Sequence, residues 1–286
     1  MHYMDYTDVF DDEPVRQRAA RPMVRRTKQE SPLSDIEHGG DNPQLEAQDD
    51  PLQLFLGEGW IRKVLHVVKS GKEATVYCCE GGAVSGGELL AAKVYRSRNN
   101  RGFKNDSIYQ EGRIVLDAHE RRAVKNKSRK GREVQAGEWM SHEWETLRAL
   151  HAAGAAVPRP YAQRGNALLM EYVGDRDSAA PPLHRVDLDR GDTRRLFEIA
   201  MAQIELWLTH NRVHADLSPY NVLVSRERLV FIDFPQAVDP RSNTNALALL
   251  ERDIANLCRY WEQYGVRADA NRISRKMWSR YIRGDL

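Results

Sequence analysis

Val213-His214-Ala215-Asp216-Leu217-Ser218-Pro219-Tyr220-Asn221-Val222-Leu223-Val224 is the segment from which the rest of the chain is best understood. It predicts a loop with Asp216 and Asn221, followed by an apolar hairpin that ends at a second aspartate, Asp233. Phosphoryl transfer needs such a set: one carboxylate orients or deprotonates the acceptor hydroxyl, while an asparagine and a carboxylate hold the magnesium ion. The alternative is a turn rich in Asn and Asp caps, but the uninterrupted hairpin between Asn221 and Asp233 argues against it.

Composition excludes several classes of protein. The chain has 286 residues, 41% of them hydrophobic, and a net charge of +2, so neither global disorder nor a polyanion-binding class is indicated. No apolar run approaches the roughly 18 residues of a membrane span and no signal peptide opens the chain, so we expect no membrane association. The three cysteines, Cys78, Cys79 and Cys258, form neither a metal-binding spacing nor a disulfide framework. A reducing, cytoplasmic location is expected.

Charge and apolar content divide the chain into three parts. Residues 1–50 are polar and proline-containing and predict a disordered tail. Residues 51–173 and 174–286 are expected to form two lobes. The first lobe contains a basic insertion at about 96–135, in which residues 96–133 hold twelve Lys and Arg against five Asp and Glu. Its densest part, Arg121 to Lys130, is either a solvated loop or a surface for RNA phosphates or an acidic protein.

The sequence of the first lobe predicts strands at 60–68, 75–79 and 89–95, with a turn at 70–74. Lys93 lies among apolar residues of the third strand, where a buried ammonium group needs an anionic partner. Nucleotide phosphates and a helix glutamate would supply that partner; the alternative is an edge-strand lysine that points to water. A helix at 136–153 is predicted by the spacing of Met140, Trp144 and Leu147. Glu143 on that helix is the candidate partner of Lys93, or else a surface glutamate.

The second lobe is expected to be mostly helical. An apolar strand at 167–174 runs into a connector where an adenine ring could bond to main-chain groups. Helices are predicted at about 192–211, with Asp192 as the cap, at 247–264 and at 269–283.

From about residue 52 to the end, the chain resembles the RIO family of atypical serine protein kinases. The segments that carry the resemblance are Ser70-Gly71-Lys72-Glu73-Ala74-Thr75-Val76-Tyr77, Ala92-Lys93-Val94-Tyr95, Met170-Glu171-Tyr172-Val173-Gly174, His214-Ala215-Asp216-Leu217-Ser218-Pro219-Tyr220-Asn221 and Ile232-Asp233-Phe234-Pro235-Gln236-Ala237. The spacing H-x-D-L-x-x-x-N is also the catalytic-loop pattern of protein kinases, with Ala215 where arginine is usual.

The resemblance implies a role for each matching residue. Asp216 would be the catalytic aspartate, Asn221 and Asp233 would bind Mg²⁺, and Lys93 would contact a phosphate of ATP and pair with Glu143. The loop that covers the phosphates would comprise Ser70, Gly71, Lys72, Glu73, Ala74 and Val76. Glu171 and Val173 would lie in the hinge that meets adenine, and the basic insertion would match the family's flexible, autophosphorylated loop.

The implied fold is α+β and two-lobed like a protein kinase, with an antiparallel sheet plus a helix in the N-lobe and a small, mostly helical C-lobe. Two features depart from the family or from ordinary kinases. Pro219 stands where relatives usually have glutamate, and only 53 residues follow Asp233, so no activation segment or peptide-docking helices are expected. The first 50 residues are too short and polar for the winged helix of some relatives, and we expect a bacterial member without it.

Three functions remain in competition at this point. The leading one is an ATP-dependent RIO-type serine/threonine protein kinase or ATPase that acts on a protein substrate, itself included. The second is a small-molecule phosphotransferase of the aminoglycoside or choline type, which also uses H-x-D-x-x-x-x-N followed by I-D-F. The third is a slow-turnover, ATP-switched assembly factor on ribosomal particles, which the basic insertion fits.

Overall fold

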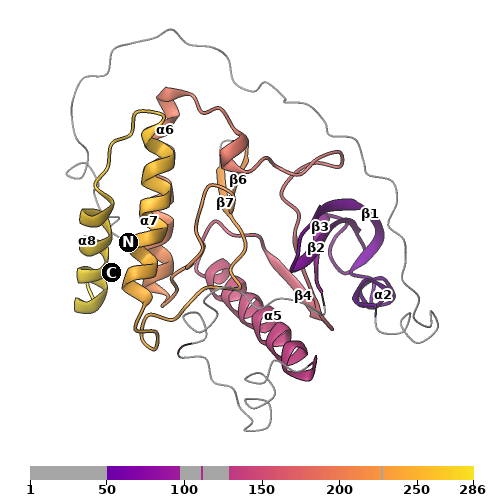
Figure 1. Ribbon diagram of the computed structural model, residues 1–286. Helices are drawn as coiled ribbons and strands as arrows, with labels where there is room; N and C mark the ends of the chain where they lie inside the picture. The colour runs from indigo at the N-terminus through magenta and orange to yellow at the C-terminus, as the bar shows by residue number, and fades with distance from the viewer. Residues whose placement is uncertain (1–49, 97–110, 112–128, 227) are drawn as a thin grey trace.

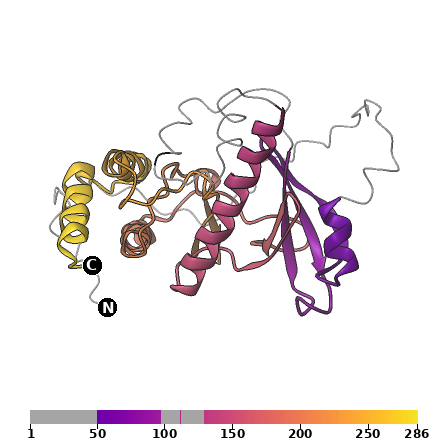
Figure 2. The same ribbon diagram turned by 90° about the horizontal axis from the view of Figure 1, so that it is seen from below.

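The computed structural model describes residues 50–96, 111, 129–226 and 228–286, and the structural statements below concern these residues. A sheet-containing N-lobe and a helical C-lobe lie side by side (Figure 1). A long helix, α5 (Arg129–Ala152), stands between the sheet and the C-lobe helices (Figure 2). The predicted α+β, two-lobed, kinase-like fold is confirmed.

The N-lobe is an antiparallel sheet in the order β1-β2-β3-β5-β4. Its elements are α2 (Pro51–Gly57), β1 (Ile61–Ser70), β2 (Ala74–Gly81), β3 (Leu89–Tyr95), β4 (Pro160–Arg164) and β5 (Ala167–Glu171). Side chains alternate across each strand, so the sheet has two different faces. One face buries Ile61 and Leu90 with Phe55 of α2, and the other carries Ala74, Tyr95 and Leu168 toward α5.

Helix α5 begins at Arg129, earlier than the predicted start at Ala136. The predicted start of the helix was wrong, because Lys, Arg and Glu favour a helix as well as a solvated loop; the helix overlaps the end of the basic insertion expected at about 96–135. The helix takes up Arg129 and Lys130 from the densest basic cluster. Residues 97–110 and 112–128 of the insertion and the predicted disordered tail up to residue 49 lie outside the described residues.

The C-lobe surrounds the predicted loop with helices. Its elements are η2 (Leu183–Arg185), α6 (Arg190–Thr209), β6 (Val222–Ser225), β7 (Arg228–Phe231), α7 (Ala246–Glu262) and α8 (Ala270–Arg283). Asp189, not Asp192 as predicted, caps α6: its backbone is extended and its carboxylate accepts a hydrogen bond from Gly191 N at 3.2 Å. Asp192 lies in the first helical turn and pairs with Arg195 instead.

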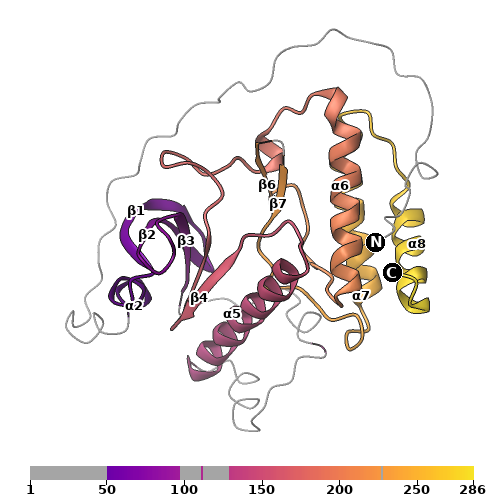
Figure 3. The same ribbon diagram turned by 180° about the vertical axis from the view of Figure 1, so that it is seen from behind.

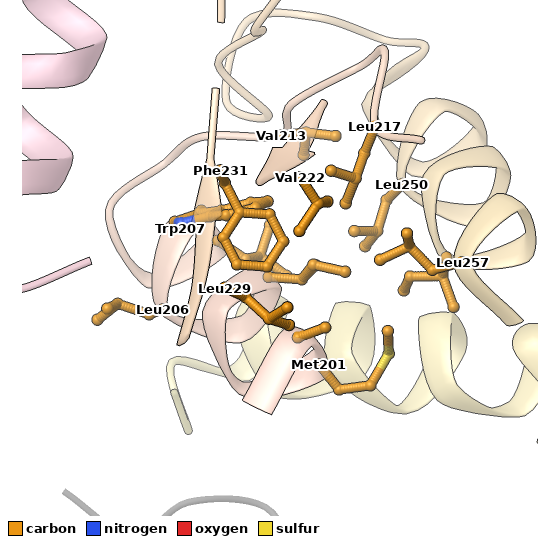
Figure 4. Close-up of a cluster of buried hydrophobic side chains, with 14 of the residues drawn as sticks. Met201, Leu206, Trp207, Val213, Leu217, Val222, Leu229, Phe231, Leu250 and Leu257 are labelled. Atoms are coloured by element: carbon orange, nitrogen blue, oxygen red, sulfur yellow. The ribbon is translucent and has the colours of Figure 1, made fainter. Parts of the chain in front are cut away.

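One apolar cluster holds the segment of residues 213–224 in place. Trp207 of α6 belongs to this cluster and packs edge-on against Phe231 of β7, with ring centroids 4.9 Å apart (Figure 4). Val213, Leu217 and Val222, which flank or interrupt the polar residues of the segment, are fully buried in this cluster. Burying such side chains stabilises the fold by about 1.5–3 kcal/mol each. The backbone of the polar residues between them is therefore held in a fixed position.

Within the described part of the chain, no helix combines the length and the apolar character that crossing a bilayer requires.

Candidate active site between the lobes

The loop that carries Asp216 is held first by His214, which is buried beneath it. Its Nε2 donates to Ile232 O at 3.1 Å, and its Nδ1 accepts the main-chain N–H of Asp216 at 3.3 Å. Because a carbonyl can only accept, Nε2 carries the proton. Burial lowers the pKa of His214 to about 4, so the ring is neutral at physiological pH. His214 thus ties the loop to the end of the hairpin without adding charge.

A second anchor comes from helix α7. The buried carboxylate of Asp253 accepts two main-chain hydrogen bonds, from Ala215 N at 2.7 Å and from Leu217 N at 3.0 Å. Arg252 donates to Ala215 O, and Asn256 donates to Leu217 O at 3.0 Å. Burial raises the pKa of Asp253 to about 7, against the opposing effect of the two amides.

Sequence reasoning missed this anchor. The available signal was an aspartate between Leu250 and Leu257, on a helix face that is otherwise apolar. A charge at such a position needs buried partners, but nothing in the spacing says that the partners are main-chain groups of the catalytic loop.

Asp216 emerges from the anchored loop directly after Ala215, whose φ of 63° is left-handed. Its side chain is exposed. Partial desolvation and the nearby Asp233 carboxylate raise the pKa of Asp216 above its ordinary value, and Arg252 and Asn221 oppose the shift. The main-chain oxygen of Asp216 accepts Asn221 Nδ2 at 3.0 Å. The loop therefore presents an acidic group whose own backbone is held by the neighbouring asparagine.

Lys93 joins the two lobes through carboxylates. Its Nζ lies 2.8 Å from both oxygens of Glu143 on α5 and 2.7 Å from Asp233 Oδ1, which follows β7. Tyr95 also donates to Glu143. Burial disfavours the ammonium, but Asp233 and Glu143 outweigh it and raise the pKa of Lys93 well above its usual value. The sequence predicted Glu143 as a partner of Lys93 but gave no sign of the contact with Asp233.

Asp233 itself has a left-handed backbone, with φ of 73°. Burial would raise its pKa, but Lys93 prevails and holds the carboxyl below its usual range. Its side chain remains 42% exposed, against 2% for Glu143. Asn221 lies next to it through the backbone, because Ile232 N donates to Asn221 O at 3.0 Å. The two side chains bond to different partners: Asn221 donates to Asp216 O, and Asp233 accepts from Lys93.

Helix α5 is fastened to the C-lobe at the same place. Glu143 Oε1 accepts Phe234 N at 3.3 Å, and His142 Nε2 donates to Ala237 O at 2.6 Å. Figure 3 shows α5 running between β4 and the C-lobe helices, so it contacts both sides of the site.

The predicted nucleotide-binding residues lie on the N-lobe side. Ser70 ends β1 and Ala74 begins β2, and Gly71, Lys72 and Glu73 make the turn between them. Val76 packs in a cluster with Cys78, Ala91 and Tyr172, next to the connector after β5. Glu171 ends β5 and Val173 follows in the connector. The turn and the connector thus stand at the edges of the sheet face that carries Lys93.

Comparison with known proteins decides the family. A family model described as the RIO domain matches residues 75–273. The chain belongs to the RIO family. Rio1 of Thermoplasma acidophilum, a RIO-type serine/threonine-protein kinase, is 31% identical over 196 residues, which cover 67% of this chain and 94% of that protein. Rio1 of Haloferax volcanii is 32% identical over 208 residues, 72% of this chain and 66% of that protein.

Human serine/threonine-protein kinase RIO1 is 27% identical over 250 residues, 84% of this chain but 41% of that protein. This RIO chain therefore spans nearly all of the Thermoplasma relative and less than half of the human one. Among solved structures, the Rio2 kinase of Chaetomium thermophilum in an ADP/Mg²⁺-phosphoaspartate complex has a TM-score of 0.59 and 20% identity, covering 78% of this chain and 64% of that one. The family resemblance inferred from the sequence is confirmed, and the chain is an ATP-dependent kinase or ATPase of the RIO type.

The contact between Lys93 and Glu143 in this RIO kinase can be tested by a double-mutant cycle. We expect Lys93→Ala and Glu143→Ala each to lower kcat/KM for ATP, and the double mutant to be little worse than either single mutant. Both changes remove the same ion pair, and residues in direct contact are typically coupled by about 0.5–3 kcal/mol. Steady-state kinetics on the four proteins gives the coupling. Effects that add within error would show that Glu143 does not act through Lys93.

Proposed function

We propose that this RIO domain binds ATP with Mg²⁺ and transfers the γ-phosphoryl group to a serine or threonine hydroxyl of a protein, the chain itself included. Asp216 acts as the catalytic residue, Lys93 contacts a phosphate, and Asn221 and Asp233 hold the metal. The observation that carries this proposal is the contact of Lys93 with both Glu143 and Asp233, 2.8 Å and 2.7 Å away, beside the loop of Asp216.

In the reaction, the hydroxyl oxygen of the acceptor forms a bond to the γ-phosphorus as the bond to the bridging oxygen of ADP breaks. The hydroxyl proton passes to the Asp216 carboxylate, whose raised pKa makes it a better acceptor than an ordinary aspartate. His214 and Asp253 keep the loop still, so that Asp216 needs no reorganisation. Lys93 has three hydrogen-bond donors, which lets it exchange a carboxylate for a phosphate oxygen.

The residues present fit a magnesium ion. Asn221 uses its amide nitrogen on Asp216 O, which leaves its carbonyl oxygen as the ligand atom. Asp233 bonds to Lys93 through Oδ1, so the carboxylate has a second oxygen. Among the described residues no group of three or more His, Cys, Asp and Glu gathers to hold a metal. This suits Mg²⁺, which takes one or two protein oxygens together with phosphates and water and, when bound, neutralises the developing phosphate charge.

The proposal extends to a partner of the basic insertion and to the location of the protein. Residues Arg121 to Lys130, which the sequence points to as a contact for RNA or a ribosomal particle, are mostly outside the described residues. Glu111, the one described residue between 97 and 128, bonds to Thr244 at 2.8 Å and Asn245 at 2.7 Å at the start of α7, so the insertion touches the C-lobe. A cytoplasmic location is supported by the three cysteines, all buried and unpaired.

The test is transfer of label from γ-labelled ATP by the purified chain. We expect magnesium-dependent ATP turnover and label on protein serine or threonine, and none on choline or aminoglycosides. Asp233→Ala should abolish magnesium-dependent ATP turnover, because the substitution removes a carboxylate oxygen that is proposed to bind the metal. Asp192→Ala, which removes an exposed carboxylate in α6, is the matched control and should leave magnesium titrations unchanged. Transfer to the small alcohols instead would favour the phosphotransferase alternative and contradict the proposal.

A further inference from the structure

Arg96, directly after β3, contacts both strands that flank the turn between β1 and β2 and the last residue of that turn. Its main-chain N–H donates to Glu73 O at 2.9 Å. Its guanidinium donates to Ser70 Oγ at 2.6 Å and to Thr75 Oγ1 at 3.0 and 3.3 Å. Arg96 therefore binds the strand residue on each side of the turn that is proposed to cover the phosphates, together with Glu73 at the end of that turn.

The hydroxyl groups of Ser70 and Thr75 lie on the two strands at the base of the turn. Ser70 and Thr75 are Cα partners across β1 and β2, so they close the base of the three-residue turn 71–73. Within the turn, Gly71 N donates to Ala74 O at 2.9 Å. A glycine-containing turn held by so few bonds of its own would otherwise sample many conformations. The fork of Arg96 fixes the distance between its ends.

Strand alternation puts Arg96 on the side of the sheet away from Lys93. Lys93 and Tyr95 both reach Glu143 on one face, whereas Val94 packs on the other face with Phe55 of α2. Arg96 and Thr75 belong to the Val94 face by the same alternation. Arg96 thus contacts the turn from the face opposite Lys93. It would affect a bound phosphate by stabilising the conformation of the turn.

Within residues 50–96, 111, 129–226 and 228–286, the side chain of Arg96 bonds to neutral hydroxyl groups. Other arginines of the N-lobe sheet pair with carboxylates, as Arg62 does with Glu80 and Arg164 with Glu58. Arg96 forms no such pair with another residue of the described part of the chain. The guanidinium is rigid and planar, and two of its nitrogens share the Thr75 hydroxyl, a geometry that a lysine cannot reproduce.

We infer that Arg96 is a positioning residue for the phosphate-covering turn, which sets affinity for the phosphates of the nucleotide and not for its base. The inference rests on the proposed function, because it needs an ATP-binding turn at residues 70–76. An ordered turn loses less conformational entropy when phosphates bind, which strengthens phosphate binding. This effect does not depend on contacts to adenine.

The experiment compares ATP with adenosine as ligands of the intact chain. Arg96→Ala should weaken ATP binding and raise KM for ATP roughly three- to tenfold, the equivalent of one or two net hydrogen bonds. Adenosine binding should stay the same, and kcat should change less than KM. Arg96→Lys keeps the positive charge but loses the planar guanidinium. It should therefore bind ATP almost as weakly as Arg96→Ala. Thr75→Val, combined with Arg96→Ala, should be non-additive.

Arg164→Ala is the matched control, since it removes a half-exposed arginine of the same sheet from its pair with Glu58. It should leave ATP and adenosine binding unchanged, and thermal unfolding should show that all variants are folded. Equal loss of ATP and adenosine affinity, full rescue by Arg96→Lys, or no loss at all in Arg96→Ala would each overturn the inference. A wild-type chain that binds adenosine but not ATP would instead contradict the proposed function, and this inference would fall with it.

Discussion

Replacing Asp216 by asparagine should lower the rate of phosphoryl transfer by roughly 10²–10⁴-fold, the usual contribution of a positioned acid–base group. Asparagine has the same shape but cannot take the hydroxyl proton. The fold should survive, because the loop is held by the main chain: Asp216 O accepts Asn221 Nδ2, and Asp216 N donates to His214. Single-turnover transfer of labelled phosphate measures the chemical step.

Nucleotide affinity separates chemistry from binding in this test. Asp216→Asn should bind magnesium–ATP about as well as the wild type, measured by calorimetry, because Lys93, Asn221 and Asp233 remain. Asp175→Asn, a change at an exposed aspartate of the connector, is the control for loss of a charge near the site. A purified Asp216→Asn protein with near-normal turnover would show that another group accepts the proton.

Replacing Asp253 by alanine should lower the free energy of unfolding by about 2–6 kcal/mol, since a buried donor left without an acceptor costs about 1–3 kcal/mol and Asp253 serves two, Ala215 N and Leu217 N. That is a large share of the roughly 5–15 kcal/mol that stabilises a typical protein. Urea unfolding with linear extrapolation measures it. Activity should fall as well, because the two amides frame Asp216.

Two variants calibrate the Asp253 result. Asp253→Asn keeps one acceptor oxygen and should lose less stability than Asp253→Ala. Asp192→Ala, at an exposed position of α6, should stay within about 0.5 kcal/mol of the wild type. If Asp253→Ala unfolded at the same urea concentration as Asp192→Ala, the carboxylate could not be the anchor of the catalytic loop.

The sequence predicted the parts of the site that have a local or periodic signal. Lys93 stood out as a charge among apolar strand residues, and Glu143 lay beside the apolar stripe of the next helix, so the pair could be anticipated. The Lys93–Asp233 contact joins residues separated by 140 positions, and periodicity carries no trace of such a contact. The bonds from Asp253 to the loop are of the same kind, from a side chain to main-chain groups 36 and 38 residues away.

The errors in element boundaries have a different cause. Two aspartates, Asp189 and Asp192, offer a cap for α6, and the choice depends on which backbone is extended, which composition does not reveal. The start of α5 at Arg129 is hidden because Lys, Arg and Glu are good helix formers and also common in solvated loops.

The attachment of α5 to the C-lobe bears on how this kinase can be regulated. Kinases are often held inactive by moving the helix with the glutamate away from the lysine. Here that movement would break the bonds of Glu143 to Phe234 N and of His142 to Ala237 O along with the ion pair to Lys93. Moving the helix outward would therefore cost more free energy than breaking the ion pair alone. We expect regulation to act on nucleotide entry or on access of the acceptor, while the helix stays in place.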